Sequence, residues 1–220
     1  MSNYTTNQTI SVCVGNYGYY AEGELRDQWL HLPMPADKLA KWPKEHGLYD
    51  SMHEEIYISD FDCEHFDLYK MFGMNIHLDD LNRLAYAMSI EPDGIETVER
   101  YLDLADKPET IGELIELVLN WREISYSDFP VDHWGDPSLE LFGIELADDY
   151  GLLKALEDNG AGSCFDFKQF AEDNLMDYLY DEKGWLLESF SYQDYSRAEL
   201  DELLIESASE KLAHDVARAA

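Results

Sequence analysis

Alternation of apolar and polar residues predicts a small β-rich unit at the start of the chain. The expected strands span residues 10–14 (ISVCV), 24–32 (ELRDQWLHL) and 54–61 (EEIYISDF). The segment GNYGYYAEG (15–23) separates the first two strands, and its glycines predict a hairpin turn. A short helix is expected at 36–42, ended by Pro43. We therefore expect an N-terminal subdomain at residues 1–62, with three strands and a short helix.

Apolar residues three and four positions apart predict a central helical subdomain at residues 63–122. Segments 77–88 (HLDDLNRLAYAM) and 95–104 (IETVERYLDL) each fit one helix. A further helix is expected to begin at Thr110, which can form a capping box with Glu113. The apolar stripe of that helix consists of Ile111, Leu114, Ile115, Val118 and Leu119.

The remaining residues, 123–220, predict a C-terminal α+β subdomain. Residues 123–147 are expected to be irregular or strand-like, because Pro130 and Pro137 interrupt them. A helix is expected at 148–158, ending at Gly160, and a second helix is expected to begin after the cap residue Asp166. A strand is expected at 185–192. A terminal helix is expected to begin at Ser196, which can form a capping box with Glu199. The predicted fold class is α+β, built from three small subdomains.

The net charge of the chain is unusually negative for a globular protein. The chain has 47 acids and 15 Lys or Arg residues, which gives a net charge of −32. Solubility requires only a few charges, and self-repulsion destabilises a compact state. The sign excludes nucleic acid and anionic membrane as direct partners and indicates a basic partner or cations. The same charge is carried by roughly 54 Å of B-DNA, at one charge per ~1.7 Å of axis.

The acids lie in stretches that lack bases. No Lys or Arg occurs between Lys44 and Lys70, or between Arg122 and Lys154. In the helix after Asp166, acids recur every three or four residues, so they can form a row with Cβ atoms about 5–6 Å apart. The candidate phosphate-mimicking acids are Glu54, Glu55, Asp60, Asp62, Glu64, Asp67, Asp128, Asp132, Asp136, Glu140, Glu145, Asp148, Asp149, Asp166, Glu172, Asp173, Asp177, Asp181 and Glu182.

Catalytic and metal-binding patterns are weak by comparison. Asp60, Asp62 and Glu64 occupy positions 1, 3 and 5 of an EF-hand loop, but His65 stands where that loop requires glycine. Cys63 and His65 have no second ligand pair of zinc-site spacing. There is no GxSxG, no P-loop and no GxGxxG after a strand. We expect no catalytic residue, no metal and no cofactor.

The lack of a recognisable secretory signal or membrane span, together with the spacing of the cysteines, favours a cytoplasmic protein. The polar start MSNYTTNQTI lacks the features of a secretory signal, and no apolar run is long enough for a membrane span. Three widely spaced cysteines do not indicate a disulfide framework and fit a reducing compartment.

Several segments resemble the ArdA antirestriction family. Residues 11–33 (SVCVGNYGYYAEGELRDQWLHLP) are similar to the opening of that family, and 54–62, 81–88 and 113–121 are similar to its later blocks. The segment CFDFKQFAEDNLMDYLY (164–180) resembles the family's antirestriction motif, although Lys168 stands where the motif usually has an acid. The motif-like residues are Phe165, Asp166, Phe167 and Ala171. The resemblance covers most of residues 10–192.

The resemblance implies an elongated, three-part α+β chain that pairs as a homodimer and imitates bent B-DNA. Such proteins occupy the DNA-binding groove in the methyltransferase core of type I restriction–modification enzymes. They are typically encoded on mobile genetic elements, use no cofactor and catalyse nothing. The apolar residues Ile124, Tyr126 and Phe129 are a candidate pairing edge. Two alternatives stay open, namely general or halophilic solubilising acidity without a specific partner, and an acidic calcium- or metal-binding protein.

Overall fold

The computed structural model describes residues 9–74, 76–105, 107–186 and 190–219, with side chains up to residue 211. Helices make up 51% and strands 15%, so the predicted α+β class is confirmed. The chain divides into two compact units, here called unit 1 (Met1–Glu99, Lys107–Trp121 and Ser191–Ala220) and unit 2 (Arg100–Asp106 and Arg122–Phe190). The division into three subdomains stays a prediction.

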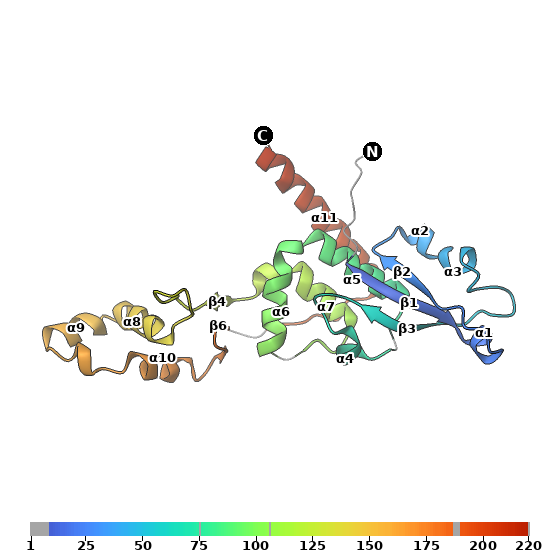
Figure 1. Ribbon diagram of the computed structural model, residues 1–220. Coiled ribbons are helices and arrows are strands. Elements are labelled where there is room, and N and C mark those ends of the chain that lie inside the picture. The colour runs from blue at the N-terminus through green and yellow to red at the C-terminus, as the bar shows by residue number, and fades with distance from the viewer. Residues whose placement is uncertain (1–8, 75, 106, 187–189, 220) are drawn as a thin grey trace. The chain divides into compact units, whose positions relative to one another are not determined.

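Unit 1 contains a three-stranded antiparallel sheet with the order β2-β1-β3 (Figure 1). Its strands are β1 (Ile10–Asn16), β2 (Gln28–Leu32) and β3 (Ile56–Asp62). Val12 of the central strand is buried and pairs with Leu30 on one side and Phe61 on the other. On β3, Asp60 and Asp62 are exposed. The sheet therefore presents carboxylates along one of its outer strands.

The segment between β1 and β2 differs from the predicted hairpin turn. It contains a helix, α1 (Tyr17–Ala21), because the Asn16 side chain accepts hydrogen bonds from the backbone N–H groups of Gly18 and Tyr19 at 2.8 and 3.3 Å. An Asn side chain in this N-cap position satisfies donors that a helix start otherwise leaves free. Consequently β2 is shorter than the strand predicted at 24–32.

The helix predicted at 36–42 is in fact two short helices, α2 (Ala36–Leu39) and α3 (Trp42–Glu45). The expectation that Pro43 ends the helix was wrong, since Pro43 lies in the first turn of α3. Proline suits that position because the first N–H groups of a helix have no partner within the helix.

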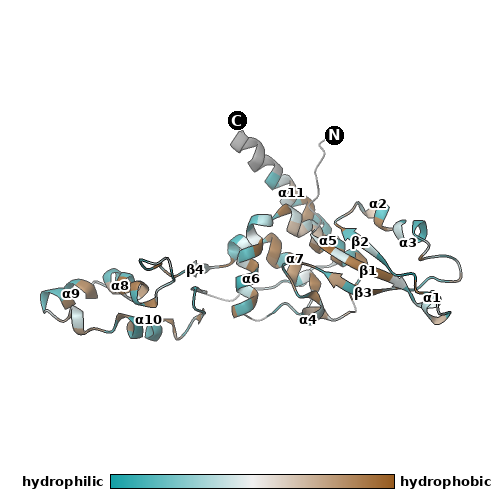
Figure 2. Cartoon of the chain, viewed as in Figure 1, coloured by the Kyte–Doolittle hydropathy of each residue, from teal (hydrophilic) through white to brown (hydrophobic). Residues whose placement is uncertain are grey.

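The remaining helices of unit 1 confirm most of the predicted helical pattern. They are α4 (Leu68–Phe72), α5 (Leu78–Ile90), α7 (Ile111–Leu119) and α11 (Arg197–Ala219), and α6 (Ile95–Leu104) begins in unit 1. The predicted capping box of α7 is present: Thr110 Oγ1 accepts from Glu113 N at 3.2 Å, and Glu113 accepts from Thr110 N at 3.3 Å. Apolar residues of β1, α5 and α7 form the buried core (Figure 2).

The terminal helix α11 is attached to α5 by ion pairs and apolar packing. Arg197 binds the Asp80 carboxylate at 2.7 Å, and Arg83 binds Asp201 at 2.8 Å. Leu200 and Leu204 of α11 are buried. The predicted Ser196–Glu199 capping box is also present, at 2.8 and 3.4 Å. The segment after residue 193 is therefore an integral part of unit 1.

The described residues of unit 2 include a small sheet, the end of α6 and three further α-helices. Its strands are β4 (Tyr126–Asp128), β5 (Leu179–Tyr180) and β6 (Gly184–Leu186), in the antiparallel order β4-β6-β5. Its helices are α8 (Leu139–Asp149), α9 (Leu152–Asp158) and α10 (Phe167–Leu175). Phe142 of α8 contacts Phe129 and Trp185, with ring centroids 5.2 and 5.8 Å apart. These rings join α8 to the sheet.

Four predictions for unit 2 need correction. The helix predicted at 148–158 begins only at Leu152, because Asp148 and Asp149 belong to α8 and Gly151 has φ +68°. Residues 139–147 are helical, because the Ser138 side chain caps α8 and Pro137 precedes the helix instead of interrupting it. The strand predicted at 185–192 is observed only to Leu186; residues 187–189 lie outside the described part, and 190–192 are not in a strand. Ile124 and Phe129 are buried, so these two side chains do not form an exposed pairing edge.

Candidate partner-binding surface

The predicted phosphate-mimicking acids lie at the surface of both units. All are exposed except Asp132, Glu172 and Asp181, which are half-buried. Within the described residues, Asp128 pairs with Arg100 and Glu172 pairs with Lys168, and no other acid of this set forms a salt bridge. The other carboxylates of the set therefore contribute their charge to the surface without a salt-bridge partner among the described residues.

One set of acids flanks the outer strand of unit 1. This β3 acidic group consists of Glu54, Glu55, Asp60, Asp62, Glu64 and Asp67, all of them exposed. A shallow hollow of about 320 Å³ lies along residues 61–69 and is lined by several of these acids together with Cys63 and His65. Charged residues on an outer strand also prevent edge-to-edge sheet pairing. The group therefore combines concentrated negative charge with an open, accessible surface.

The hollow does not have the chemistry of a preformed metal site. Within the described residues, no group of three or more His, Cys, Asp or Glu side chains is arranged to hold a metal ion. Burial raises the pKa of the Cys63 thiol, which disfavours the thiolate that zinc binds. The arrangement is suited instead to contacts between several carboxylates and a basic surface.

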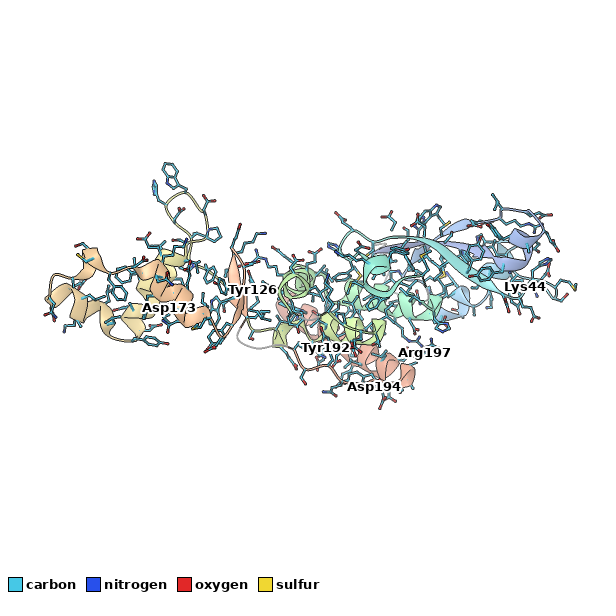
Figure 3. All side chains as sticks on the ribbon, turned by 90° about the horizontal axis from the view of Figure 1, so that it is seen from below. Lys44, Tyr126, Asp173, Tyr192, Asp194 and Arg197 are labelled. Carbon is cyan, nitrogen blue, oxygen red and sulfur yellow. The ribbon has the colours of Figure 1, made fainter. Side chains whose placement is uncertain are left out.

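A second set of acids lies on the helices of unit 2. This helical acidic group consists of Glu140, Glu145, Asp148 and Asp149 on α8, Glu172 and Asp173 on α10, and Asp177 just after α10. The predicted row of acids along one helix after Asp166 is wrong, because α10 ends at Leu175 and Asp181 lies in the turn between β5 and β6. Asp148 and Asp149 lie three and four residues after Glu145, so both are on the same side of α8 as Glu145. Asp173 of α10 is exposed and lies at the surface in Figure 3.

Close packing between α8 and α10 fixes these rows. A Cβ atom added at Gly143 of α8 would lie 1.9 Å from the main-chain oxygen of Phe167 in α10, so only glycine permits this approach. Ala147 and Ala171 are fully buried in the same unit. Small side chains thus let the two helices hold their acidic faces in fixed positions.

Four predicted acids also maintain local structure. Asp67 and Asp166 cap α4 and α10 by accepting from Lys70 N at 3.0 Å and Gln169 N at 2.9 Å. Asp132 and Asp181 accept main-chain N–H groups in tight turns. Such Asx-type contacts order turns and helix starts. These four residues therefore serve folding as well as surface charge.

The motif-like residues mainly pack inside unit 2. Asp166 is the only exposed member, whereas Ala171 is buried and Phe165 and Phe167 are half-buried. The rings of Phe165 and Phe167 contact each other at 5.0 Å, and Phe165 contacts Phe170 at 5.5 Å. The motif thus positions α10, and it also contributes the exposed Asp166 carboxylate to the surface.

A polar cluster in unit 1 was not anticipated from the sequence. The Tyr19 hydroxyl donates a hydrogen bond to the Asp50 carboxylate at 2.7 Å. Together with hydrogen bonds from Met52 and His53, it holds the pKa of Asp50 well below its usual range. His53 lies 2.9 Å from Asp50 and 3.3 Å from Glu22, and the hydrogen bond to Asp50 raises its pKa. Since Tyr19 and Glu22 are far in sequence from Asp50 and His53, no local pattern indicates that the two pairs associate.

Some acids do not contribute to the surface at all. Asp80, Glu91 and Glu116 are buried. Asp80 binds Arg83 and Arg197, Glu91 accepts from the Trp121 indole N–H at 2.8 Å, and Glu116 accepts from Gln193 N at 2.9 Å. Burial of carboxylates is tolerated because each is hydrogen-bonded.

The described residues include no helix that is long and apolar enough to cross a membrane. The fold and its surface define an acidic α+β protein whose unpaired carboxylates suit a basic partner. The family model described as Antirestriction protein (ArdA) matches residues 12–186, and the chain therefore belongs to the ArdA family. Neither the search of curated proteins nor the search of solved structures returned a match. Members of the ArdA family inhibit type I restriction enzymes and are not themselves enzymes.

Proposed function

We propose that this protein inhibits a type I restriction–modification enzyme by mimicking B-DNA and competing for the DNA-binding groove of its methyltransferase core. The observation that carries the proposal is the exposure of almost all the candidate acids without salt-bridge partners among the described residues. A DNA-binding groove is basic because it neutralises phosphates, and it attracts any surface with comparable charge.

The arrangement of the acids supports mimicry better than general acidity does. Acids spaced by three or four residues on α8 form a row, with Cβ atoms about 5–6 Å apart. On β3, by contrast, Asp60 and Asp62 are two residues apart and extend from the same face of an outer strand. Both arrangements give series of negative charges on rigid elements, which resemble the regular charges of a phosphate backbone.

Folding energy keeps these charges in place. Like charges one helical turn apart destabilise a helix by about 0.2–0.5 kcal/mol per pair. Burying one large apolar side chain contributes about 1.5–3 kcal/mol in the opposite direction. On α8, where Asp148 and Asp149 lie about one turn after Glu145, the packing of Phe142 against Phe129 and Trp185 opposes this repulsion. The acids need not be paired for the helices to be stable.

We further expect the protein to act in the cytoplasm as a homodimer, without metal or cofactor. A two-fold dimer would double the number of acids presented to the enzyme. General solubilising acidity is the competing explanation. It gives no reason for a specific enzyme to bind the chain more tightly at one acidic group than at another.

Neutralising a group of acids tests the proposal. A variant with Asp60→Asn, Asp62→Asn, Glu64→Gln and Asp67→Asn keeps the cap of α4, because asparagine caps a helix about as well as aspartate. A matched control carries Asp194→Asn, Glu202→Gln, Glu206→Gln and Glu210→Gln, four exposed acids outside the matched segment. Both variants lose the same charge, so a difference between them reports position.

Affinity for the methyltransferase core is measured for both variants at low salt. We expect the first variant to bind at least about tenfold more weakly than the control, equivalent to about 1.4 kcal/mol distributed over four contacts. Equal losses in the two variants would mean that only total charge matters, and would favour solubilising acidity over mimicry.

A further inference from the structure

A tryptophan is displayed at the tip of a loop in unit 2. The side chain of Trp134 is 83% exposed, and its ring contact among the described residues is with His133, at 5.2 Å between centroids. The loop of residues 131–137, here called the Trp134 loop, connects β4 to α8 and extends away from the helices of its unit (Figure 3). Tryptophan is enriched among the few residues that contribute most of the binding energy at protein interfaces.

Hydrogen bonds hold the Trp134 loop in one conformation. Val131 and Pro137 form an isolated β-bridge at its base. Asp132 N donates to the Asp136 carbonyl at 2.7 Å, and the Asp132 carboxylate accepts from Trp134 N at 2.8 Å and from Asp136 N at 3.0 Å. The loop is thus ordered before it meets a partner, which lowers the entropy lost on binding.

Backbone conformation at the tip contributes to this order. Gly135 has φ +86°, a value that side-chain-bearing residues rarely adopt. Its N–H donates to the Asp132 carbonyl at 3.1 Å and closes the turn. The turn leaves the indole outside the fold, although Trp134 has apolar area that folding would ordinarily bury.

The Trp134 loop combines an exposed indole with two carboxylates. Asp132 and Asp136 lie two residues to either side of Trp134, and the loop contains no Lys or Arg. An indole is a planar, fused five- and six-membered ring system, similar in size and shape to a purine. The tip therefore presents a base-like ring plane together with negative charge.

We propose that Trp134 enters the pocket in which the methyltransferase core holds a target base extruded from DNA. This inference rests on the proposed function and adds the specific contact that the acids alone do not supply. Methyltransferases flip their target nucleotide out of the duplex and stack the base between aromatic or apolar side chains. Trp134 occupies that pocket without the cost of unstacking a base pair, since it is already exposed.

Replacing the indole tests this contact. Trp134→Ala is compared with Met52→Ala, whose side chain is equally exposed (83%) but lies in unit 1. Because the loop is held by main-chain bonds and Asp132, both variants are expected to keep the wild-type circular dichroism spectrum. We expect the Kd for the methyltransferase core to rise about 30-fold for Trp134→Ala, the effect of a hot-spot residue worth about 2 kcal/mol, and to change little for Met52→Ala.

A double-mutant cycle locates the contact. Binding of wild-type protein and Trp134→Ala is measured to the normal methyltransferase core and to a core whose base-stacking aromatic residue is replaced by alanine. The proposal predicts that Trp134→Ala costs about 30-fold with the normal core and less than about threefold with the altered core, because coupling appears only between residues in contact. The same loss with both cores would overturn the assignment to the base pocket.

The outcomes separate this inference from the proposed function. If wild-type protein fails to bind the methyltransferase core, the proposed function itself is wrong. If wild-type protein binds and Trp134→Ala binds equally well, the acidic surface suffices and the Trp134 inference alone is overturned. Trp134→Phe provides a further check, because a smaller ring is expected to recover part of the affinity lost in the alanine variant.

Discussion

Substituting Gly143 with alanine tests the close packing that supports the acidic helices of unit 2. The new Cβ would lie 1.9 Å from the Phe167 main-chain oxygen, whereas ordinary contact begins at 3.4 Å. The helices α8 and α10 must therefore separate locally by about 1.5 Å, or one of them must deform. The obstacle is backbone, so no side-chain rotation can relieve it.

Two opposing effects determine the size of the change. Overpacking of this kind costs about 1–3 kcal/mol, while exchanging glycine for alanine inside a helix contributes up to about 1 kcal/mol in favour of folding. We expect the free energy of unfolding to fall by about 1–2 kcal/mol. With a urea dependence of about 2 kcal/mol/M, the unfolding midpoint moves lower by about 0.5–1 M.

The assay is urea unfolding followed by tryptophan fluorescence and circular dichroism. Gly112→Ala provides a matched control in α7, because its Cβ would find its nearest neighbours at ordinary distances of 3.5 and 3.6 Å. That variant is expected to be unchanged or slightly stabilised. A Gly143→Ala protein as stable as the wild type would refute the close approach of α8 and α10 on which the fixed acidic rows depend.

Three further predictions concern unit 1. Thr110→Ala removes the cap of α7 and is expected to lower the free energy of unfolding by about 1 kcal/mol, measured by urea titration. Asp80→Asn leaves Arg83 and Arg197 without a common partner; we expect faster amide hydrogen exchange in α11 and unchanged exchange in the strands. His53 has a raised pKa in the folded state, so its contribution to stability is complete below about pH 6.5 and is lost as the pH rises through the folded-state pKa. The stability difference between wild type and His53→Gln should accordingly be larger at pH 5.5 than at pH 9, and an equal difference at both would contradict this role.

Local patterns in the sequence predicted the elements whose ends are closed by nearby residues. The helix starts at Thr110, Asp166 and Ser196 were found correctly because each cap and its donor lie within three residues. Pro43 and Pro137 were misinterpreted as interruptions, because proline at or just before a helix start favours the helix and only an interior proline breaks it. Periodicity alone does not distinguish these two situations.

The surface was less predictable than the fold. That most acids are exposed follows from their charge. The exceptions depend on contacts between distant parts of the chain, such as Asp80 with Arg197 and Tyr19 with Asp50. The sequence also did not predict that Trp134 is exposed. Trp134 lies in a loop between Pro130 and Pro137, where no periodic pattern of apolar residues indicates which side chains are buried.

If the protein and DNA bind to one basic groove, each must exclude the other, and a competition titration measures this directly. The methyltransferase core is titrated with labelled duplex DNA at several concentrations of this protein, at about 50 and about 200 mM salt. We expect the apparent Kd for DNA to rise linearly with the protein concentration. We also expect the inhibition constant to weaken at least about tenfold at the higher salt, because counterions are released from both surfaces. A ternary complex of enzyme, DNA and this protein, or an inhibition constant that does not change with salt, would contradict these expectations.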